Sequence, residues 1–325
     1  MSKTRACPKC GFNSPSEIEC LRCGIIFESF INLGIQGVES AELIQQQNDP
    51  VAVEEPDVVA PVFFNYKVNV WSLPLGLIGA FLLQKFWVFH YLVFLFCVIP
   101  VHEMGHAFAA WMNGRFALPI GAIVPTAGMT IIGYSYNFLI TLIFFGVFGY
   151  LAFKAYQQKL YFWTAVSCGL ILASIGMMTS LKTDQVGPFI SYGGIAGEFL
   201  ISMVLIISFY QPTFKMLRWD FFRYPFFVMG CMAFVNACSM WLRIQSKLES
   251  LPFGTAVSAD GAGDSNGDMN RLVQAGWSES LIISKYLSLG KIAFTLILIQ
   301  YIYSVVNSRA EKKRKIQSES ENETH

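Results

Sequence analysis

The chain has 325 residues, of which 54% are hydrophobic and only 14% are charged. Soluble domains carry about 25% charged residues, so this composition argues against an ordinary soluble protein. The formal net charge is +1, and no basic patch is interleaved with aromatic residues, so nothing supports nucleic-acid binding. We therefore expect an integral, multi-pass membrane protein whose main surroundings are the lipid bilayer.

Two Cys-x-x-Cys-Gly knuckles stand near the N-terminus, formed by Cys7 with Cys10 and by Cys20 with Cys23. Four thiolates in this pattern are typical of a closed, tetrahedral structural zinc site, and the spacing resembles a zinc ribbon. Two disulfides are the alternative, but adjacent knuckles without a preceding apolar signal segment favour metal. Reduced thiolates predict a cytoplasmic N-terminus. So small a module needs its metal for folding, and it could bind a protein partner or the substrate.

Composition divides the chain into four parts. Residues 1–30 form the expected zinc ribbon, 31–66 a polar linker, 67–308 the transmembrane domain and 309–325 a polar tail. A membrane-spanning helix needs about 20 apolar residues. The stretches that approach this length are 69–84, 86–112, 137–153, 160–181, 187–210, 222–243 and 284–307. The first is short and contains Pro74, so we expect six to seven transmembrane helices.

A segment of different character follows the second apolar stretch. Residues 117–133 are rich in β-branched residues and are interrupted by Gly and Pro, which predicts short extended strands. Strand edges cannot face lipid, so this segment must pack on protein or lie at the membrane interface. The expected fold is an all-α polytopic membrane protein with a short β element and a small N-terminal zinc ribbon.

The second apolar stretch contains the motif His-Glu-x-x-His, formed by His102, Glu103 and His106. Two histidines four residues apart lie on one helical face, one turn apart, so both imidazoles can bind one zinc ion. The glutamate between them can act as general base towards a water that the zinc acidifies. Ionisable residues within an apolar stretch are costly and are usually functional. This motif therefore predicts a catalytic zinc site inside the membrane.

A catalytic zinc takes three protein ligands and keeps a fourth position open. His90 would lie about 18 Å from His102 along a helix, so a carboxylate is the expected third ligand. The acidic candidates are Asp260, Asp264 and Asp268 in the polar loop 245–280, Asp184 between two stretches, and Glu198 within one. Four apolar stretches separate the histidines from the loop. This even number places both on the same membrane face in either orientation.

The motif and the later Asp268 together resemble the site-2 protease family, the intramembrane zinc metalloproteases. That family pairs His-Glu-x-x-His in a membrane helix with an aspartate that is followed by Gly and an Arg-aliphatic run. Here Asp268 is followed by Met269 in place of Gly, and then by an Arg-Leu-Val run that begins at Arg271. The resemblance implies Asp268 as the third zinc ligand, while Asp260 and Glu198 remain alternatives.

The resemblance is looser in the second half of the chain. The family has a Pro close before the aspartate, whereas Pro252 is distant from Asp268, and the nearest in-membrane Asn is Asn236. Family members also carry Gly-Pro-x-x-Asn on an intervening helix, where this chain has Gly-Ile-Ala-Gly-Glu at 194–198. Glu198 could orient the substrate or the active site.

The implied activity is hydrolysis of peptide bonds in membrane-embedded protein substrates by a zinc-activated water, with Glu103 as general base. Two zinc ions per chain are expected, one catalytic and one structural. The segment 117–133 fits the extended element that, in the family, is thought to hold the substrate as an added strand. The alternative is a non-proteolytic membrane protein whose zinc sites serve assembly or regulation.

The orientation of the chain presents a conflict. A cytoplasmic N-terminus and seven spans would place the His102 site near the cytoplasmic face. The same count would place the basic run Lys312–Lys315 outside, although Lys and Arg concentrate in cytoplasmic loops. We therefore expect that one of the seven apolar stretches is not a simple span.

Overall fold

The computed structural model describes residues 5–6, 13–14, 66–124, 127–212, 223–253 and 267–323. Six of the predicted metal-ligand candidates lie outside these residues: Cys7, Cys10, Cys20, Cys23, Asp260 and Asp264. The chain forms two compact units, Met1–Glu55 and Pro56–His325, with a boundary inside the predicted linker. In the first unit, strands β1 (Arg5–Ala6) and β2 (Asn13–Ser14) pair antiparallel.

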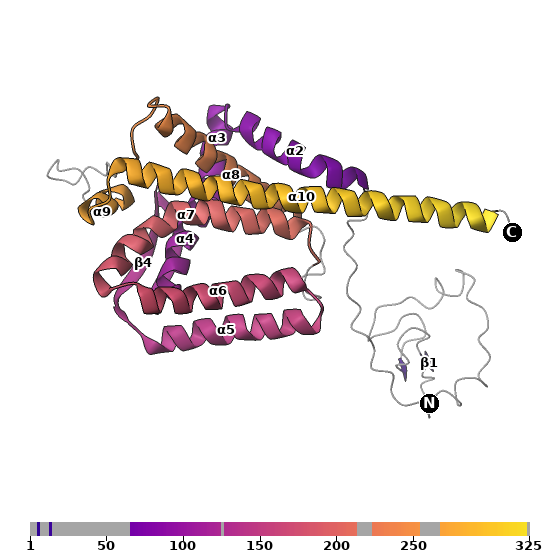
Figure 1. Cartoon of the computed structure of the whole chain (residues 1–325), viewed down its shortest axis with the longest axis horizontal. Helices are drawn as coiled ribbons and strands as arrows, with labels where there is room; N and C mark the ends of the chain where they lie inside the picture. Colours follow the sequence, from indigo (N-terminus) through magenta and orange to yellow (C-terminus); the bar gives the residue numbers. More distant parts are fainter. Residues whose placement is uncertain are drawn as a thin grey trace. The chain divides into compact units, whose positions relative to one another are not determined.

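Within the described residues, seven helices are long and apolar enough to cross a membrane. They are α2 (Tyr66–Leu83), the run of α3 (Trp87–Val93), the π-helix η3 (Phe94–Val98) and α4 (Ile99–Met112), α5 (Phe138–Gln157), α6 (Tyr161–Ser180), α7 (Thr183–Phe209), α8 (Arg223–Gln245) and α10 (Glu279–Glu323). Each overlaps one of the predicted apolar stretches, which confirms the multi-pass helical architecture (Figure 1). The largest difference is α10, which remains helical through most of the predicted polar tail.

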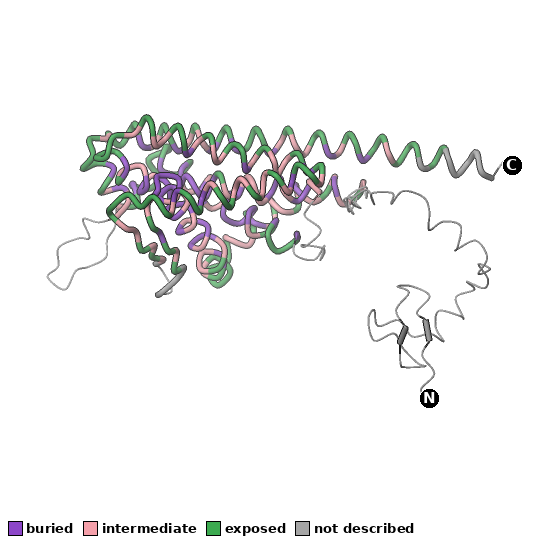
Figure 2. Tube along the Cα trace, turned by 90° about the horizontal axis from the view of Figure 1, so that it is seen from below, coloured by how far each residue is buried: buried purple, intermediate pink, exposed green. Residues whose placement is uncertain are grey.

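The outward faces of these helices are apolar. Large hydrophobic side chains are exposed along α2, α5 and α10, among them Trp71, Phe138, Tyr150 and Ile302. Figure 2 shows exposed outer turns around a buried centre. Contiguous apolar surface of this extent is rare on soluble monomers and marks a surface that contacts lipid or protein. A multi-pass membrane protein accounts for it.

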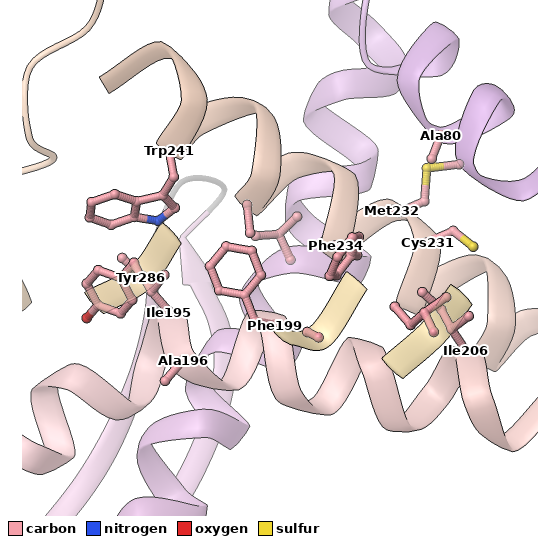
Figure 3. Packing of buried hydrophobic residues seen from close by; sticks show 14 of the residues in the cluster. Ala80, Ile195, Ala196, Phe199, Ile206, Cys231, Met232, Phe234, Trp241 and Tyr286 are labelled. Carbon is pink, nitrogen blue, oxygen red and sulfur yellow. The ribbon is translucent and has the colours of Figure 1, made fainter. Parts of the chain in front are cut away.

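The core forms where α7, α8 and α10 pack together (Figure 3). Phe199 of α7 meets Phe234 of α8 edge-to-face at 6.0 Å between ring centroids, and Trp241 of α8 lies 4.5 Å from Tyr286 of α10. All four side chains are buried. In lipid, helices associate through close packing rather than through the hydrophobic effect. These aromatic contacts therefore hold α10 against α7 and α8, and the latter two helices contribute residues to the lining of the site.

The helices α4 and α7 cross at glycines. A Cβ on Gly105 would lie 2.8 Å from both Gly194 O and Gly197 Cα, and a Cβ on Gly193 would lie 2.7 Å from Ala109 Cβ. Such distances leave no room for a larger residue. Small residues at the crossing allow two helix backbones to approach closely, as in other membrane bundles. The helix that carries the histidines is thus held tightly against the helix that carries Glu198.

The helix with the His-Glu-x-x-His motif is irregular just before the motif. Phe94–Val98 form a π-helical turn, and Pro100 follows at the start of α4. Proline has no N–H to donate and disrupts a regular α-helical ladder, whereas a wide turn changes the hydrogen-bonding pattern and accommodates a bend. π-helical turns of this kind are frequent at functional sites.

The predicted β element is an antiparallel hairpin of β3 (Arg115–Val124) and β4 (Ala127–Tyr136). It begins after Gly114, whose φ of +64° lies in the left-handed region that glycine adopts readily. The indole N–H of Trp111 donates to Ala117 O at 3.0 Å, which ties β3 to α4. The prediction of extended strands packed on protein is confirmed.

Candidate metal centre

Two histidines from α4 and an aspartate from α9 (Asp268–Gln274) converge on one point. The Nε2 atoms of His102 and His106 lie 3.1 Å apart, and Asp268 Oδ2 lies 3.2 and 3.0 Å from them. Neighbouring ligand atoms of a tetrahedral zinc with bonds of about 2.0–2.1 Å lie roughly 3.3 Å apart. The three donor atoms thus fit one Zn²⁺ with a fourth position open.

The other nitrogen of each imidazole is already bound. His106 Nδ1 lies 2.7 Å from Ile190 O, and His102 Nδ1 lies 2.8 Å from Glu198 Oε1. A carbonyl oxygen can only accept, so Nδ1 of His106 carries a hydrogen and its Nε2 is left for a metal. The Glu198 carboxylate directs His102 in the same way. Partners of this kind hold metal-binding histidines in the ligating tautomer and orientation.

Space for a metal is provided by a glycine. A Cβ on Gly194 would lie 2.5 Å from His106 Nε2 and 2.6 Å from His102 Nε2. Any side chain at this position would occupy the region that both ligating nitrogens face. The residue types, the Nε2 atoms that converge with Asp268 and this open space all fit zinc.

The Asp268 carboxyl lies outside the membrane-spanning helices, at the start of α9. Burial by itself would raise its pKa, but the charge of His106 and hydrogen bonds with both histidines hold the pKa well below its ordinary range. The carboxylate is therefore ionised at neutral pH, which is the form that a metal ligand requires. The surroundings of Asp268 thus favour a proton or a cation between it and the two imidazoles.

Glu103 is held by the hairpin. Its side chain is buried, and its Oε2 accepts a hydrogen bond of 2.6 Å from the Thr130 hydroxyl of β4. A Cβ on Gly128 would lie 2.6 Å from Glu103 Cγ, so the backbone of β4 packs closely against the Glu103 side chain. The hairpin therefore fixes Glu103 at the site. The sequence did not identify Thr130 or Gly128, because their contact with Glu103 depends on how the hairpin packs on α4.

One cavity of about 610 Å³ is lined by both histidines, Asp268, Glu103, Glu198 and the hairpin residues Gly128 and Thr130. This size is within the range of ligand-binding clefts, about 300–1,000 Å³. Its apolar wall includes Phe94, Val98, Met129, Ile195 and Met240, and its polar lining includes Ser191, Asn236 and Arg271. Pro252 lines it as well, although its separation from Asp268 in sequence departs from the family pattern. The arrangement combines a metal site, a carboxylate and an apolar wall in one chamber.

The remaining candidates fall into different places. Glu198 is a hydrogen-bond partner of His102 Nδ1, and its carboxylate is not among the three clustered metal-ligand atoms. Asp184 lies in the first turn of α7 and also does not join the cluster, and His90 lies in α3. Among the described acids, only Asp268 belongs to the cluster of possible metal ligands with His102 and His106. The predicted position of Asp268 beside them is thus what the structure shows.

Replacing Glu198 is expected to weaken zinc binding. Loss of such an orienting partner typically lowers metal affinity 10–100-fold, so we expect that effect for Glu198→Ala. Glu198→Gln retains an acceptor oxygen and should lose less. The measurement is competition with a chromophoric chelator after the cysteines have been alkylated. Glu249→Gln, which changes an exposed carboxylate paired with Arg243, is the matched control. Wild-type affinity in Glu198→Ala would rule out the orienting role.

No family model, curated protein or solved structure matches the chain. The assignment of a function therefore rests on the chemistry of the site.

Proposed function

We propose that this protein is an intramembrane zinc metalloprotease that hydrolyses peptide bonds of membrane-embedded protein substrates. The observation that carries the proposal is the convergence of His102, His106 and Asp268 beside Glu103 in one cavity of an apolar helical bundle. Two histidines, one carboxylate and an adjacent glutamate are the donor set and base that zinc peptidases use.

Each side chain has a distinct task. His102, His106 and Asp268 hold the metal, and Glu198 and Ile190 O keep the two imidazoles aligned. Bound zinc supplies a Lewis acid that polarises a carbonyl and acidifies a water. The carboxylate of Glu103, which the Thr130 hydroxyl holds in place, takes the proton from the attacking water. Glu103 then delivers this proton to the nitrogen of the leaving amine, which completes hydrolysis.

The hairpin can present the substrate. A peptide bond within a helix is covered by its own turns, so a membrane segment must become extended before it is cut. Met129, Thr130 and Ile132 of β4 line the cavity, and in the described part of the chain β4 pairs with β3 alone. An extended segment of substrate can therefore add to the open edge of β4 through backbone hydrogen bonds. This places its carbonyl groups beside the metal ligands.

Removal of zinc tests the proposal. The full chain is reconstituted in lipid vesicles with a panel of doubly tagged, single-span test substrates. Cleavage is expected to fall to background after treatment with a membrane-permeant zinc chelator and to return when zinc is added. His102→Ala should remain inactive at the same zinc concentration. Cleavage that survives chelation would contradict the mechanism, and zinc-loaded protein that cuts no substrate would favour the non-proteolytic alternative.

A further inference from the structure

The first helix of the membrane domain, α2, begins beside the C-terminal half of the last one, α10. Ser72 Oγ lies 2.6 Å from Tyr210 OH, just after the end of α7, and Tyr301 OH of α10 donates to Val70 O at 2.7 Å. Lys312 Nζ lies 5.7 Å from the ring centroid of Tyr66. We call this end of the bundle, marked by Tyr66 and Lys312, the tail end. An odd number of crossings would place the two residues on opposite membrane faces.

The helix α2 stops partway through the bundle. Gln84, which follows α2, donates from Nε2 to Met232 O at 3.0 Å, and Ala80 lies in the same core as Met232 (Figure 3). Met232 stands nine residues after the start of α8 at the tail end, which is about 14 Å of helical rise. A bilayer core is about 30 Å thick, so α2 ends near its middle.

The next helical run, from α3 to α4, continues in the same direction as α2, away from the tail end. The Ser174 hydroxyl donates to Met112 O at 2.7 Å, which places the end of α4 near the end of α6 and the start of α7. His106 bonds Ile190 O near the start of α7, whereas α2 touches the opposite end of α7. In Figure 1, α2 lies on the side towards the end of α10, and α4 lies on the side of α9. We call this second end, marked by Met112 and Asp268, the metal end.

Of the two polar residues at the joint between these helices, Gln84 has a partner inside the protein, whereas Lys85 is exposed beside the exposed Phe81 ring of α2. Gln84 donates to Met232 O, and Lys85 Nζ lies 4.7 Å from the ring centroid of Phe81. A polar group at the bilayer centre needs such partners because lipid offers none. The contact of Gln84 with α8 therefore suits a position of the joint within the membrane, although in sequence it resembles an ordinary loop between two spans.

We propose that α2 and α3–α4 share a single crossing, that the chain crosses the membrane six times, and that the metal cavity opens at the face opposite the C-terminal tail. The other five crossings are α5, α6, α7, α8 and α10. With six crossings, an even number, Tyr66 and Lys312 lie on the same membrane face, as their contact at the tail end requires. It also identifies α2 as the apolar stretch that is not a simple span.

Charge assigns a side to each end. The described basic residues at the tail end are Lys67, Lys154, Lys159, Arg223, Arg309, Lys312, Lys313, Arg314 and Lys315. Those at the metal end are Arg115, Lys182, Arg243, Lys247, Arg271 and Lys285. Two further basic residues, Lys215 and Arg218, occur in the sequence that connects α7 to α8, two helices that end and begin at the tail end. By contrast, no basic residue occurs in 254–266, the sequence between α8 and α9.

The face richer in Lys and Arg is the cytoplasmic one. The tail end is thus cytoplasmic, in agreement with the reduced N-terminal cysteines expected from the sequence. The metal end then faces the non-cytoplasmic side.

This placement defines the substrate class, if the proposed proteolysis holds. His106 stands six residues before the end of α4, so the metal lies about 9 Å inside the metal end. Substrates are then membrane segments whose scissile bond lies near the non-cytoplasmic face of the bilayer. Cleavage releases a short non-cytoplasmic piece and leaves most of the span with the cytoplasmic part.

The topology is tested with single epitope tags in the full chain, placed directly before Tyr66, after the C-terminus, or at the exposed turn of Lys247. In intact cells, an external protease should degrade only the tag at Lys247, and after lysis it should reach all three. Zinc retention after cysteine alkylation shows that each tagged protein has folded. Tags at Tyr66 and the C-terminus on opposite sides would overturn the six-crossing assignment, and a reversed pattern would overturn the orientation.

The substrate class is tested separately by mass spectrometry of fragments from the reconstituted vesicles. Cuts are expected in the non-cytoplasmic third of each test span. Cuts near the cytoplasmic end would refute the substrate assignment while leaving proteolysis intact. A correct tag pattern with no cleavage by zinc-loaded protein would instead refute the proposed function and leave the topology standing.

Discussion

Glu103→Gln is expected to reduce the rate of substrate cleavage by a factor on the order of 10²–10⁴, the usual contribution of a general base. Glutamine has nearly the same shape, and its amide oxygen can still accept the hydrogen bond from Thr130. It cannot take a proton from water at neutral pH. Because Glu103 is not one of the three converging ligands, the zinc bound by His102, His106 and Asp268 should remain. Cleavage in vesicles and zinc content after cysteine alkylation measure the two effects.

Zinc content and cleavage, compared across variants, distinguish a role of Glu103 as general base from a structural role. His102→Ala should lose both zinc and cleavage, whereas Glu103→Gln should lose cleavage alone. Glu249→Gln removes the same charge from an exposed ion pair with Arg243 and should behave as wild type. If Glu103→Gln cut substrate within about threefold of the wild-type rate, Glu103 could not be the base. If it also lost zinc, its role would be structural support of the site.

Helical periodicity is why the first half of the site could be predicted from sequence. The relation between His102 and His106 is local, because four residues bring side chains to one face of any α-helix. Asp268 required a longer inference, from the even number of intervening helices and the Arg-Leu-Val run. Met269 stands where the expected pattern has Gly. Its side chain is buried in the core, where a large apolar residue anchors α9.

Glu198 could be recognised as important but not assigned to a role. A carboxylate within a membrane helix is costly enough to suggest function. Whether it meets Nε2 or Nδ1 of His102 depends on the distance and rotation between α4 and α7. These are set by the glycine contact of Gly105 with Gly197, which the sequence does not reveal without the fold. The same limit applies to Thr130, since the hairpin contains register shifts that move its side chains relative to α4.

The direction of α2 could not be predicted because sequence reports length and hydropathy but not depth. Gln84 and Lys85 separate two apolar stretches, and such a break usually marks a loop at the membrane surface. Here the Met232 carbonyl of α8 provides a partner for Gln84, while Lys85 is exposed beside the Phe81 ring. Only a tertiary contact such as that of Gln84 distinguishes a joint within the membrane from a surface loop. The contradiction between seven spans and the basic tail was the available signal that one stretch was different.

Gly194→Ala is expected to remove zinc from the metal centre as completely as His102→Ala does. The added methyl group would lie 2.5 and 2.6 Å from the two Nε2 atoms, inside the space that the metal needs. The helix α7 cannot retreat to relieve this contact without losing its close packing on Gly105 through Gly193 and Gly197. The imidazoles cannot rotate away without breaking their bonds to Glu198 and Ile190 O. Cleavage should therefore fall with the zinc content.

Gly187→Ala is the matched control, because it makes the same change on the same helix. Among the described residues, nothing beyond its own helical turn and chain neighbours lies within 4 Å of a Cβ placed there, so zinc content and cleavage should match those of wild type. Alanine favours a helix over glycine, so neither variant should weaken α7 itself. Retention of the alkylation-resistant zinc in Gly194→Ala would show that the metal lies elsewhere. Loss of zinc in Gly194→Ala alone would locate the metal between His102 and His106, where hydrolysis by Glu103 requires it to be.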